Sequence, residues 1–365
     1  MKLLHISDLH IGKRIYEFTM LEEQKYILGE ILDIIDKCGV QAILISGDVY
    51  DKSVPPVEAV DVFDDFVTSL ARRNLTVFVI AGNHDSPERL SFGSRIMDKH
   101  KIYFAGECKD EISKIRLKDE HGALNIYLMP YLRPGLALLA LGALKADASE
   151  RNILLAHQFV TSEGEHPQLS DSESRQEHRL SLGGIGNIDA SLFDAFDYVA
   201  LGHIHRPQKI GRDTVRYSGS PLKYSFSECT HKKSAVIIDA AEKGRLEFTL
   251  VELKPKRDLA EIKCALAELG AQTVPKDAYV HVTLTDEALI IDAIGKVREI
   301  YPDVMLLDYD NFRSRTENSS NALSSGDIKN QTPLQLFAGF FEAQNGSPLT
   351  VSQTMLFDKL TAGAE

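Results

Sequence analysis

Side chains able to bind metals or move protons recur in this sequence at the ends of short apolar runs. Each run, such as "TVFVIAG" before Asn83, is typical of a buried β-strand. The residues at or just beyond these ends are Asp8, His10, Asp48, Asp51, Asn83, His84, Asp85, His157, His203 and His205. Because the carboxyl ends of parallel strands meet at one edge of a sheet, residues far apart in the chain would converge there.

This set of residue types predicts a metal centre. Carboxylate and carboxamide oxygens combined with imidazole nitrogens, without cysteine, suit Mn²⁺, Fe or Zn²⁺. The set is too large for one ion, but it would serve two ions about 3.5–4 Å apart that share one carboxylate. In the pairs Asp8–His10 and His203–His205, residues two positions apart would lie on one face of an extended strand.

Each motif alone has an ordinary explanation. A histidine such as His157 on an apolar strand is more often a hydrogen-bonded core residue, and Gly82 followed by Asn83 suits a common turn. The recurrence of the motifs in order, each at the end of an apolar run, favours the metal centre over these alternatives.

Helical and strand patterns alternate in the N-terminal part of the chain. Apolar spacing predicts helices over Met20–Lys37 and Pro56–Ala71, between strands at "KLLHIS", "AILISG" and "TVFVIAG". Such alternation predicts βαβ units and a largely parallel central sheet. Further strands are expected at "LNIYLMP", "NILLAHQ", "DYVALGH", "TVRYSGS" and "SAVIID", and a long functional loop over Thr161–Gly186.

A smaller α+β module is expected after a break near Glu252–Leu259. It would contain a helix over Leu259–Leu269, a strand at "AYVHVTL", a helix over Ala288–Tyr301 and a strand at "VMLLDYD". The expected domains are therefore residues 1–254, an α+β module over 255–312, a flexible polar linker over 313–332 and a helical tail over 333–365. Two short tail helices cannot bury their apolar faces alone, so they should dock on another surface.

Charge and composition restrict the possible partners and location. The chain of 365 residues holds 53 acidic and 41 basic residues, a net charge of -12, so it is not a general polycation. Four scattered cysteines and an N-terminus without a signal peptide predict a cytoplasmic protein. No apolar run is long enough to span a bilayer, so no membrane partner is expected.

A local basic island interrupts this acidic background between His203 and Lys233. Its cations, among them Arg206, Lys209 and Lys223, could contact the phosphates of a nucleic acid. A solvated hairpin face would give the same pattern. Arg89 is a further candidate for a DNA contact, or for an ion pair at the start of a helix.

The motif series "DLH", "GDVYD", "GNHD", "AHQ" and "GHIH" resembles the calcineurin-like metallophosphoesterase superfamily. Longer segments, including "LHISDLHIGK", "IAGNHDSPERLSFGS" and "YSGSPLKYSFSE", resemble the nuclease subunits of bacterial SbcCD complexes, and this likeness covers nearly the whole chain. The resemblance implies an α/β fold: a four-layer α/β/β/α sandwich with a smaller α+β capping domain and a C-terminal helical tail.

The resemblance also implies a role for each site residue. One metal would be held by Asp8, His10, Asp48 and His205, and the other by Asp48, Asn83, His157 and His203, with Asp48 bridging. His84 would act as general acid or transition-state donor, and the carboxylate of Asp51 would orient it. Gly82 would let the chain turn sharply, and Asp85 would brace that turn.

The function implied is that of a Mn²⁺-dependent nuclease acting at DNA ends and hairpins. It would be a double-strand exonuclease and single-strand endonuclease in DNA repair, recombination and replication, working with an SbcC-type ATPase. The apolar tail positions Leu334, Leu336, Phe337, Phe340 and Phe341 would contact that ATPase. Helices near Pro56–Ala71 and Arg89–Lys99 would form a homodimer, and the complex with the ATPase would be a heterotetramer.

Two alternatives remain open at the level of sequence. The first is a phosphoesterase with the same chemistry that acts on small phosphoesters or phosphoproteins. The second is a non-catalytic scaffold that binds DNA or the ATPase, against which the complete ligand set argues.

Overall fold

A computed structural model describes residues 1–108, 111–170, 173–174, 187–288, 290–311, 332–345 and 348–361. Its contacts divide the chain into two units, Met1–Leu259 and Ala260–Glu365. The linker predicted over 313–332 lies outside the described residues except for Thr332, as does much of the loop predicted over Thr161–Gly186.

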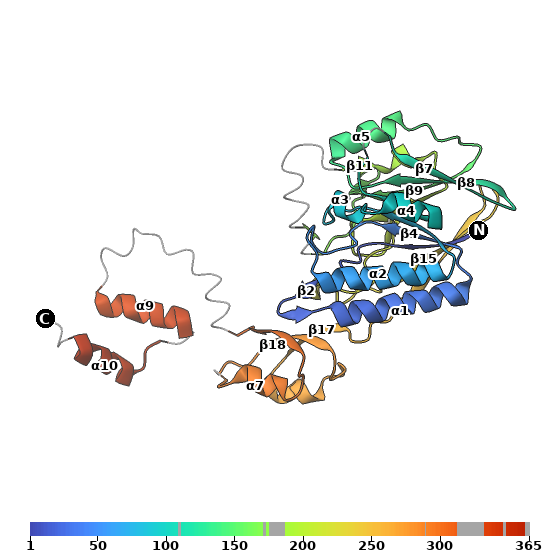
Figure 1. Cartoon of the computed structure of the whole chain (residues 1–365). Helices are drawn as coiled ribbons and strands as arrows, with labels where there is room; N and C mark the ends of the chain where they lie inside the picture. Colours follow the sequence, from blue (N-terminus) through green and yellow to red (C-terminus); the bar gives the residue numbers. More distant parts are fainter. Residues whose placement is uncertain are drawn as a thin grey trace. The chain divides into compact units, whose positions relative to one another are not determined.

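The first sheet of the larger unit has six strands in the order β16-β15-β1-β4-β5-β6. The parallel strands are β1 (Lys2–Ile6), β4 (Ala42–Ser46), β5 (Thr76–Ile80) and β6 (Ile102–Ala105), and the antiparallel ones are β15 (Ser234–Ala240) and β16 (Leu246–Glu252). Helices α1 (Leu21–Cys38) and α2 (Val57–Arg72) lie side by side on its outer face (Figure 1). Both helices therefore form where the apolar spacing predicts them.

The second sheet has six strands in the order β13-β14-β12-β9-β8-β7. Its central strands β14 (Arg212–Tyr217), β12 (Tyr198–Gly202), β9 (Arg151–His157) and β8 (Gly122–Met129) are parallel, and β13 (Gln208–Ile210) and β7 (Ser113–Asp119) are antiparallel edges. Helix α5 (Pro134–Ala143) covers its outer face, where Ala137 and Leu141 pack with sheet residues such as Leu154.

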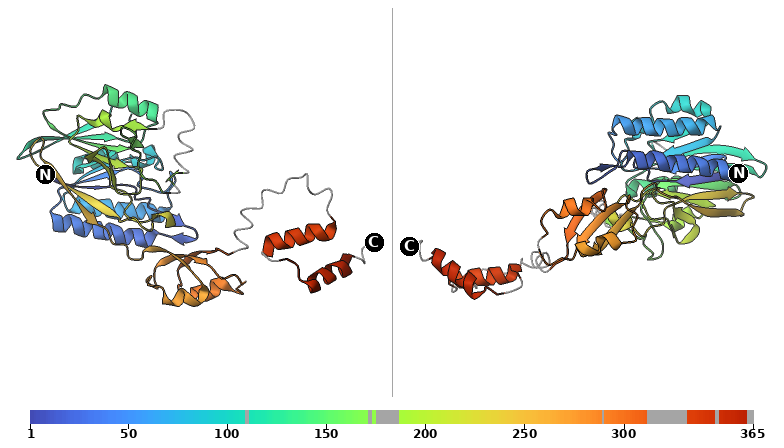
Figure 2. Two further views of the ribbon diagram at one scale, coloured as in Figure 1. Left: turned by 180° about the vertical axis from the view of Figure 1, so that it is seen from behind. Right: turned by 90° about the horizontal axis from the view of Figure 1, so that it is seen from below.

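The two sheets face each other across one hydrophobic core. Leu44 and Phe78 from the first sheet pack there with Leu155, Ala200 and other residues from the second. Helices, sheet, sheet and helix therefore form four layers, which can be followed from behind and from below in Figure 2. The predicted α/β/β/α sandwich is confirmed.

The second unit contains a three-stranded sheet in the order β17-β18-β19. The strands are β17 (Leu259–Cys264), β18 (Tyr279–Leu284) and β19 (Val304–Tyr309), with helix α7 (Ala293–Arg298) and the short helix η4 (Leu266–Ala271). The helix predicted over Leu259–Leu269 is wrong, because its first half pairs as a strand. There Ile262 and Cys264 are buried while Glu261 and Lys263 are exposed, a period of two. The helix predicted over Ala288–Tyr301 is confined to Ala293–Arg298.

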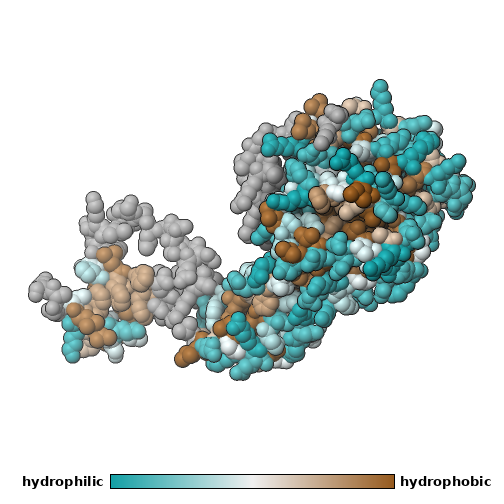
Figure 3. Space-filling model, in the orientation of Figure 1, coloured by the Kyte–Doolittle hydropathy of each residue, from teal (hydrophilic) through white to brown (hydrophobic). Residues whose placement is uncertain are grey.

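The tail contains the two expected helices, α9 (Pro333–Asn345) and α10 (Val351–Thr361). They touch through the stacked rings of Phe337 and Phe357, whose centroids are 4.6 Å apart. Phe340 and Met355 nevertheless remain 61% and 67% exposed. Figure 3 shows apolar atoms gathered on this helical pair.

The remaining elements are short and connect the layers. They are β2 (Arg14–Ile15), β3 (Phe18–Thr19), α3 (Pro87–Leu90), α4 (Ser94–Met97), η1 (Asp98–His100), β10 (Val160–Thr161), β11 (Ile188–Asp189), η2 (Ala190–Phe193) and η3 (Phe226–Glu228). Within the described ranges, none of the helices has both the length and the apolar character needed to cross a lipid bilayer.

One buried polar pair joins the two sheets. His5 of β1 lies 3.0 Å through Nδ1 from the hydroxyl of Tyr198 on β12, and its Nε2 is buried without a hydrogen-bond partner in the described structure. Burial, with Arg216 nearby, lowers the pKa of His5 to about 3. The folded protein therefore keeps His5 neutral at pH values where an unfolded chain would protonate it.

We expect this histidine to make the protein less stable in mild acid. Because the folded pKa lies below the unfolded one, the stabilisation is complete above about pH 6.5 and is lost as the pH falls; at pH 5 the loss is about 2 kcal/mol. Urea unfolding followed by circular dichroism at pH 7 and pH 5 measures the free energy of unfolding. In His5→Gln the difference between the two pH values should shrink by about that amount, and an unchanged difference would contradict the assignment.

Candidate metal centre

The predicted site residues converge on the rim where the two sheets meet. Asp8, Asp48 and Asn83 follow the carboxyl ends of β1, β4 and β5 in the first sheet, and His157 and His203 lie at the ends of β9 and β12 in the second. Two hydrogen bonds join these ends: His157 Nδ1 donates to Ser46 O at 2.8 Å, and His203 N donates to Asp8 Oδ1 at 3.0 Å. The expected convergence therefore involves both sheets.

The first group of ligand atoms belongs to Asp8, His10 and His205. One ligand atom from each lies within 4.8 Å of the others. His10 Nε2 and His205 Nε2 are 3.1 Å apart, and all three side chains are almost completely buried. Such an arrangement of two imidazoles and a carboxylate is the donor set of a divalent transition metal.

The second group is centred on Asn83. Its Oδ1 lies 3.0 Å from His157 Nε2 and 2.9 Å from His203 Nδ1. Asp48 lies between the two groups, because its Oδ2 is 3.3 Å from His157 Nε2 and 3.7 Å from His10 Nε2. A carboxylate in this position could serve both groups at once.

The loops that carry the ligands have an unusual backbone. Asp8, His10, Asp48 and His203 have φ values of 54°, 44°, 49° and 102°, a region that non-glycine residues seldom occupy. The prediction that Asp8 and His10 share one face of an extended strand is therefore wrong, since β1 ends at Ile6. Left-handed turns direct both side chains inward instead. Strain of this kind collects at functional sites, at about 1–3 kcal/mol for each residue.

Two glycines let the strand ends approach each other. A Cβ on Gly82 would stand 2.1 Å from Asp48 Oδ1, and one on Gly202 would stand 1.9 Å from Ser46 O. Gly82 was predicted to permit a sharp turn. Its role is better described as leaving room for Asp48, because any side chain at position 82 would displace Asp48.

Buried polar side chains hold the ligand loops in place. The carboxylate of Asp85 accepts hydrogen bonds from the main-chain N–H groups of Val49, Tyr50 and Gly82, so it braces the turn as predicted. On α1, Gln24 Nε2 donates to His10 O at 2.7 Å, and Gln24 Oε1 accepts from Gly12 N at 3.0 Å.

His84 lies beside the ligands and is positioned by main-chain groups. Its Nδ1 donates to the carbonyl oxygen of Asp51 at 2.9 Å, and its N–H donates to Asp48 Oδ1 at 2.8 Å. The carboxylate of Asp51 instead binds Lys13 Nζ at 2.7 Å and lies 3.8 Å from His10 Nδ1. The hydrogen bond to His84 is thus made by the carbonyl of Asp51 and not, as expected, by its carboxylate.

Burial and close charges shift the pKa values of the cluster. Burial alone would lower the pKa of His157 and of His205, but Asp48 raises the first to about 9 and Glu228 raises the second to about 8. Burial alone would raise the pKa of Asp48, yet His157, His84 and His10 bring it well below its usual range. The same burial lowers the pKa of His10.

The residues present fit a pair of hard or borderline divalent cations. The donors are carboxylate, carboxamide and imidazole groups, and His10 Nδ1 is buried without a hydrogen-bond partner in the described part of the chain. Four closely packed imidazoles, of His10, His157, His203 and His205, lie beside the carboxylates of Asp8 and Asp48. Their opposing demands for protons would be satisfied by bound cations.

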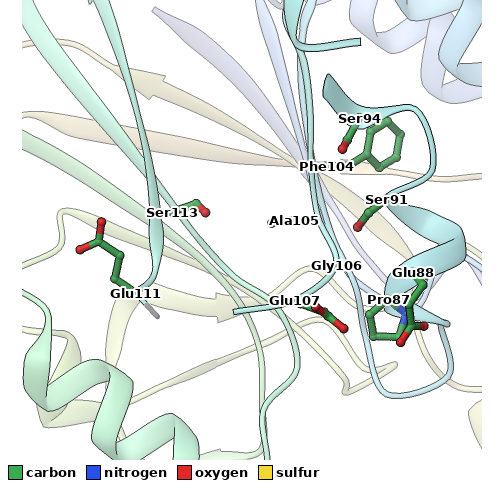
Figure 4. Close-up of a pocket in the computed structure, with 10 residues that line it drawn as sticks. All are labelled: Pro87, Glu88, Ser91, Ser94, Phe104, Ala105, Gly106, Glu107, Glu111 and Ser113. Atoms are coloured by element: carbon green, nitrogen blue, oxygen red, sulfur yellow. The ribbon is translucent and has the colours of Figure 1, made fainter. Parts of the chain in front are cut away.

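A cavity of about 440 Å³ opens next to this cluster. It is lined by Asn83 and His84 on one side and by Asp51, Lys52, Ser53 and Val54 on the other. Arg89, the predicted DNA contact, is exposed, and its Nη1 donates to the main-chain oxygen of Ser53, a residue that lines this cavity, at 2.6 Å. A separate pocket of about 670 Å³ beside α3 touches none of the ligands, and Glu88, Glu107 and Glu111 make it unsuitable for an anion (Figure 4).

Most cations of the basic island already have partners. Lys209 pairs with Asp213 at 2.6 Å, and Lys223 pairs with Asp258 at 2.8 Å. Three others, Arg212, Arg216 and Lys233, bind main-chain carbonyls or buried groups. Arg206 and Lys232 are exposed and line one pocket of about 480 Å³ together with His231.

The sequence alone gave no indication of two groups that support the site. Lys233 is the last cation of the basic island and Glu228 is one of its few acidic residues, but both are buried and they pair with each other at 2.6 Å. For Gln24 a signal existed, since it is a polar residue on the apolar face of a helix between Met20 and Leu28.

Comparison with known proteins agrees with this geometry. Residues 1–207 match the family model of calcineurin-like phosphoesterases, and residues 249–345 match the "Type 5 capsule protein repressor C-terminal domain". The D subunit of the nuclease SbcCD from Staphylococcus epidermidis is 30% identical over 376 residues, covering 97% of this chain and 96% of that protein.

Two solved structures are also similar. TT1561 of Thermus thermophilus is 17% identical with a TM-score of 0.37, covering 68% of this chain and 98% of that one. A dimetal phosphatase from Danio rerio is 12% identical with a TM-score of 0.38, covering 69% of this chain and 99% of that one. From the family model and the curated relative, the chain belongs to the calcineurin-like phosphoesterases and, among them, to the family of SbcD-type nuclease subunits.

Proposed function

We propose that this protein is a metal-dependent phosphodiesterase that cleaves DNA at ends and hairpins. The observation that carries the proposal is the position of Asp48 between His10 and His157, with His84 beside it at an open cavity. The relative from Staphylococcus epidermidis is named as a nuclease, which supports the choice of substrate.

The proposed centre holds two divalent ions, with Mn²⁺ as the metal. One would be held by Asp8, His10, Asp48 and His205, and the other by Asp48, Asn83, His157 and His203. When bound, the ions would neutralise the charge of the phosphodiester and activate a water molecule for attack. Neutralisation is needed because the phosphodiester is an anion that repels nucleophiles.

The chain itself would supply the proton for the leaving oxygen. The hydrogen bond from His84 Nδ1 to Asp51 O fixes a proton on that nitrogen, so the imidazolium form carries its second proton on Nε2. That proton would pass from Nε2 to the leaving oxygen as the phosphorus–oxygen bond breaks, leaving a neutral imidazole. Asp51 contributes through its carbonyl, as a positioning residue.

The proposed path of DNA crosses the pocket of Arg206, His231 and Lys232. Arg206 directly follows the ligand His205, and neither Arg206 nor Lys232 has an ion-pair partner among the described residues. Lys209 and Lys223 would give up existing ion pairs to contact a phosphate. We therefore assign the stronger phosphate contacts to Arg206 and Lys232.

The proposed protein partners are an SbcC-type ATPase and a second copy of this chain. Exposed apolar side chains on α9 and α10, such as Phe340 and Met355, suit insertion against a partner's helices. Val57 on α2, Phe92 just before α4 and Ile96 on α4 are 72%, 85% and 70% exposed. They would form the homodimer contact of a heterotetramer.

We expect His84→Ala to lower the kcat for DNA cleavage by about 10²–10⁴-fold, the usual contribution of a general acid. Mn²⁺ content should be unchanged, because His84 is not a ligand in this account. The assay uses linear duplex, hairpin and single-stranded DNA beside a chromogenic phosphomonoester and a cyclic nucleotide, with His100→Ala, an exposed histidine, as the matched control.

Two results of this assay would support the alternatives. Turnover of only the small substrates by the fully loaded protein would indicate a small-molecule phosphoesterase. No turnover of any substrate would indicate a scaffold.

We expect Arg206→Ala/Lys232→Ala to weaken DNA binding and to reduce the slope of log K against log salt by about 2, because two phosphate contacts disappear. Cleavage of a small phosphodiester should be unaffected. The matched control is Lys209→Ala/Lys223→Ala, which removes two cations that are already paired. A larger loss in the control than in the first variant would overturn this assignment.

A further inference from the structure

Behind His205 lies a buried ion pair, Glu228–Lys233, that does not line the 440 Å³ cavity beside His84, although Lys233 lines the pocket of Arg206 and Lys232. His205 Nδ1 is 3.1 Å from Glu228 Oε1, while His205 Nε2 faces the other ligands. Since a carboxylate only accepts, Nδ1 must donate, and Nε2 of a neutral ring is left with its lone pair toward the ligand cluster. Glu228 thus sets the orientation of the His205 ring from the side opposite the other ligands.

Glu228 is itself held firmly. Lys233 Nζ donates to Glu228 Oε2 at 2.6 Å, to His205 O at 2.9 Å and to Ser220 Oγ at 2.8 Å. These contacts close a ring from the main chain of His205 through Lys233 and Glu228 back to its imidazole. The side chains of Glu228 and Lys233 are 0% and 3% exposed.

A buried ion pair contributes little to the stability of a fold, because its desolvation opposes the attraction between the charges. Removing two charges from water costs several kcal/mol per ion, and apolar residues of similar size often serve stability equally well. The pair at Glu228 and Lys233 therefore calls for a role besides stability, and its contact with His205 supplies one.

In the other ligand group, Nδ1 of His157 does not face a carboxylate. His157 Nδ1 donates to the neutral carbonyl of Ser46 at 2.8 Å. An anionic acceptor makes an imidazole a stronger donor to a metal than a neutral one does. His205 and His157 thus differ in the group that accepts the hydrogen bond from Nδ1, a carboxylate for His205 and a carbonyl for His157.

We propose that Glu228, held by Lys233, is a positioning residue that fixes His205 with Nε2 toward the metal and strengthens binding at the group of Asp8, His10 and His205. This inference rests on the metal centre of the proposed function. It predicts that loss of Glu228 weakens one ion and spares the other.

The test is a Mn²⁺ titration of the full chain by calorimetry, with electron paramagnetic resonance to follow the spin-coupled ion pair. In Glu228→Gln one of the two ions should bind about 10–100-fold more weakly, and the coupled signal should be lost at low metal concentration. The matched control is Asp119→Asn, which breaks another buried ion pair, Asp119–Arg151, away from the ligands. It should lower stability and leave both affinities unchanged.

A second variant guards against misfolding. Glu228→Gln leaves Lys233 without its counter-ion, whereas Glu228→Gln/Lys233→Met leaves no unpaired buried charge and should show the same loss at one ion. Wild-type affinity for both ions in these variants, or an equal loss at both ions, would overturn the inference. If the wild-type protein bound no pair of ions, the proposed metal centre itself would fail.

Discussion

The structure depends on the close contact of two sheets at their carboxyl-terminal rim. Asp48 from the first sheet lies within 3.3 Å of His157 from the second, and Gly82 and Gly202 leave the space for that approach. Neither sheet contains a complete set of ligands. The sandwich core beneath, from Leu44 to Leu155, is what keeps the two rims at this distance. The packing of the core therefore determines the geometry of the site.

Around this contact the chain has concentrated groups that would be unfavourable elsewhere. Four of the proposed ligands have left-handed backbone, and buried charged side chains lie close together. Asp85, Gln24 and the pair of Glu228 and Lys233 hold these loops through hydrogen bonds to main chain and ligands. Bound cations would relieve the mutual repulsion of the imidazoles, so folding and metal binding should favour each other.

Apolar runs and their polar ends were sufficient to predict the strands and which residues meet at their ends. The sandwich of two sheets was expected only from the family resemblance. The sequence was insufficient for local geometry. The residue types of Asp8 and His10 do not reveal that their φ values are left-handed. The alternation of an extended strand was therefore wrongly expected there. At Leu259–Cys264 the intrinsic helix preference of Ala, Glu and Lys was overridden by pairing with β18. Glu228 and Lys233 gave no signal, because only burial distinguishes them from surface charges.

The central claim is that one carboxylate, Asp48, joins two cation sites built from both sheets. Anomalous diffraction from crystals grown with Mn²⁺ tests it most directly. The account predicts two peaks about 3.5–4 Å apart, with Asp48 between them, one beside Asp8, His10 and His205 and the other beside Asn83, His157 and His203. A single peak, or peaks away from Asp48 with the imidazoles still hydrogen-bonded to one another, would contradict it.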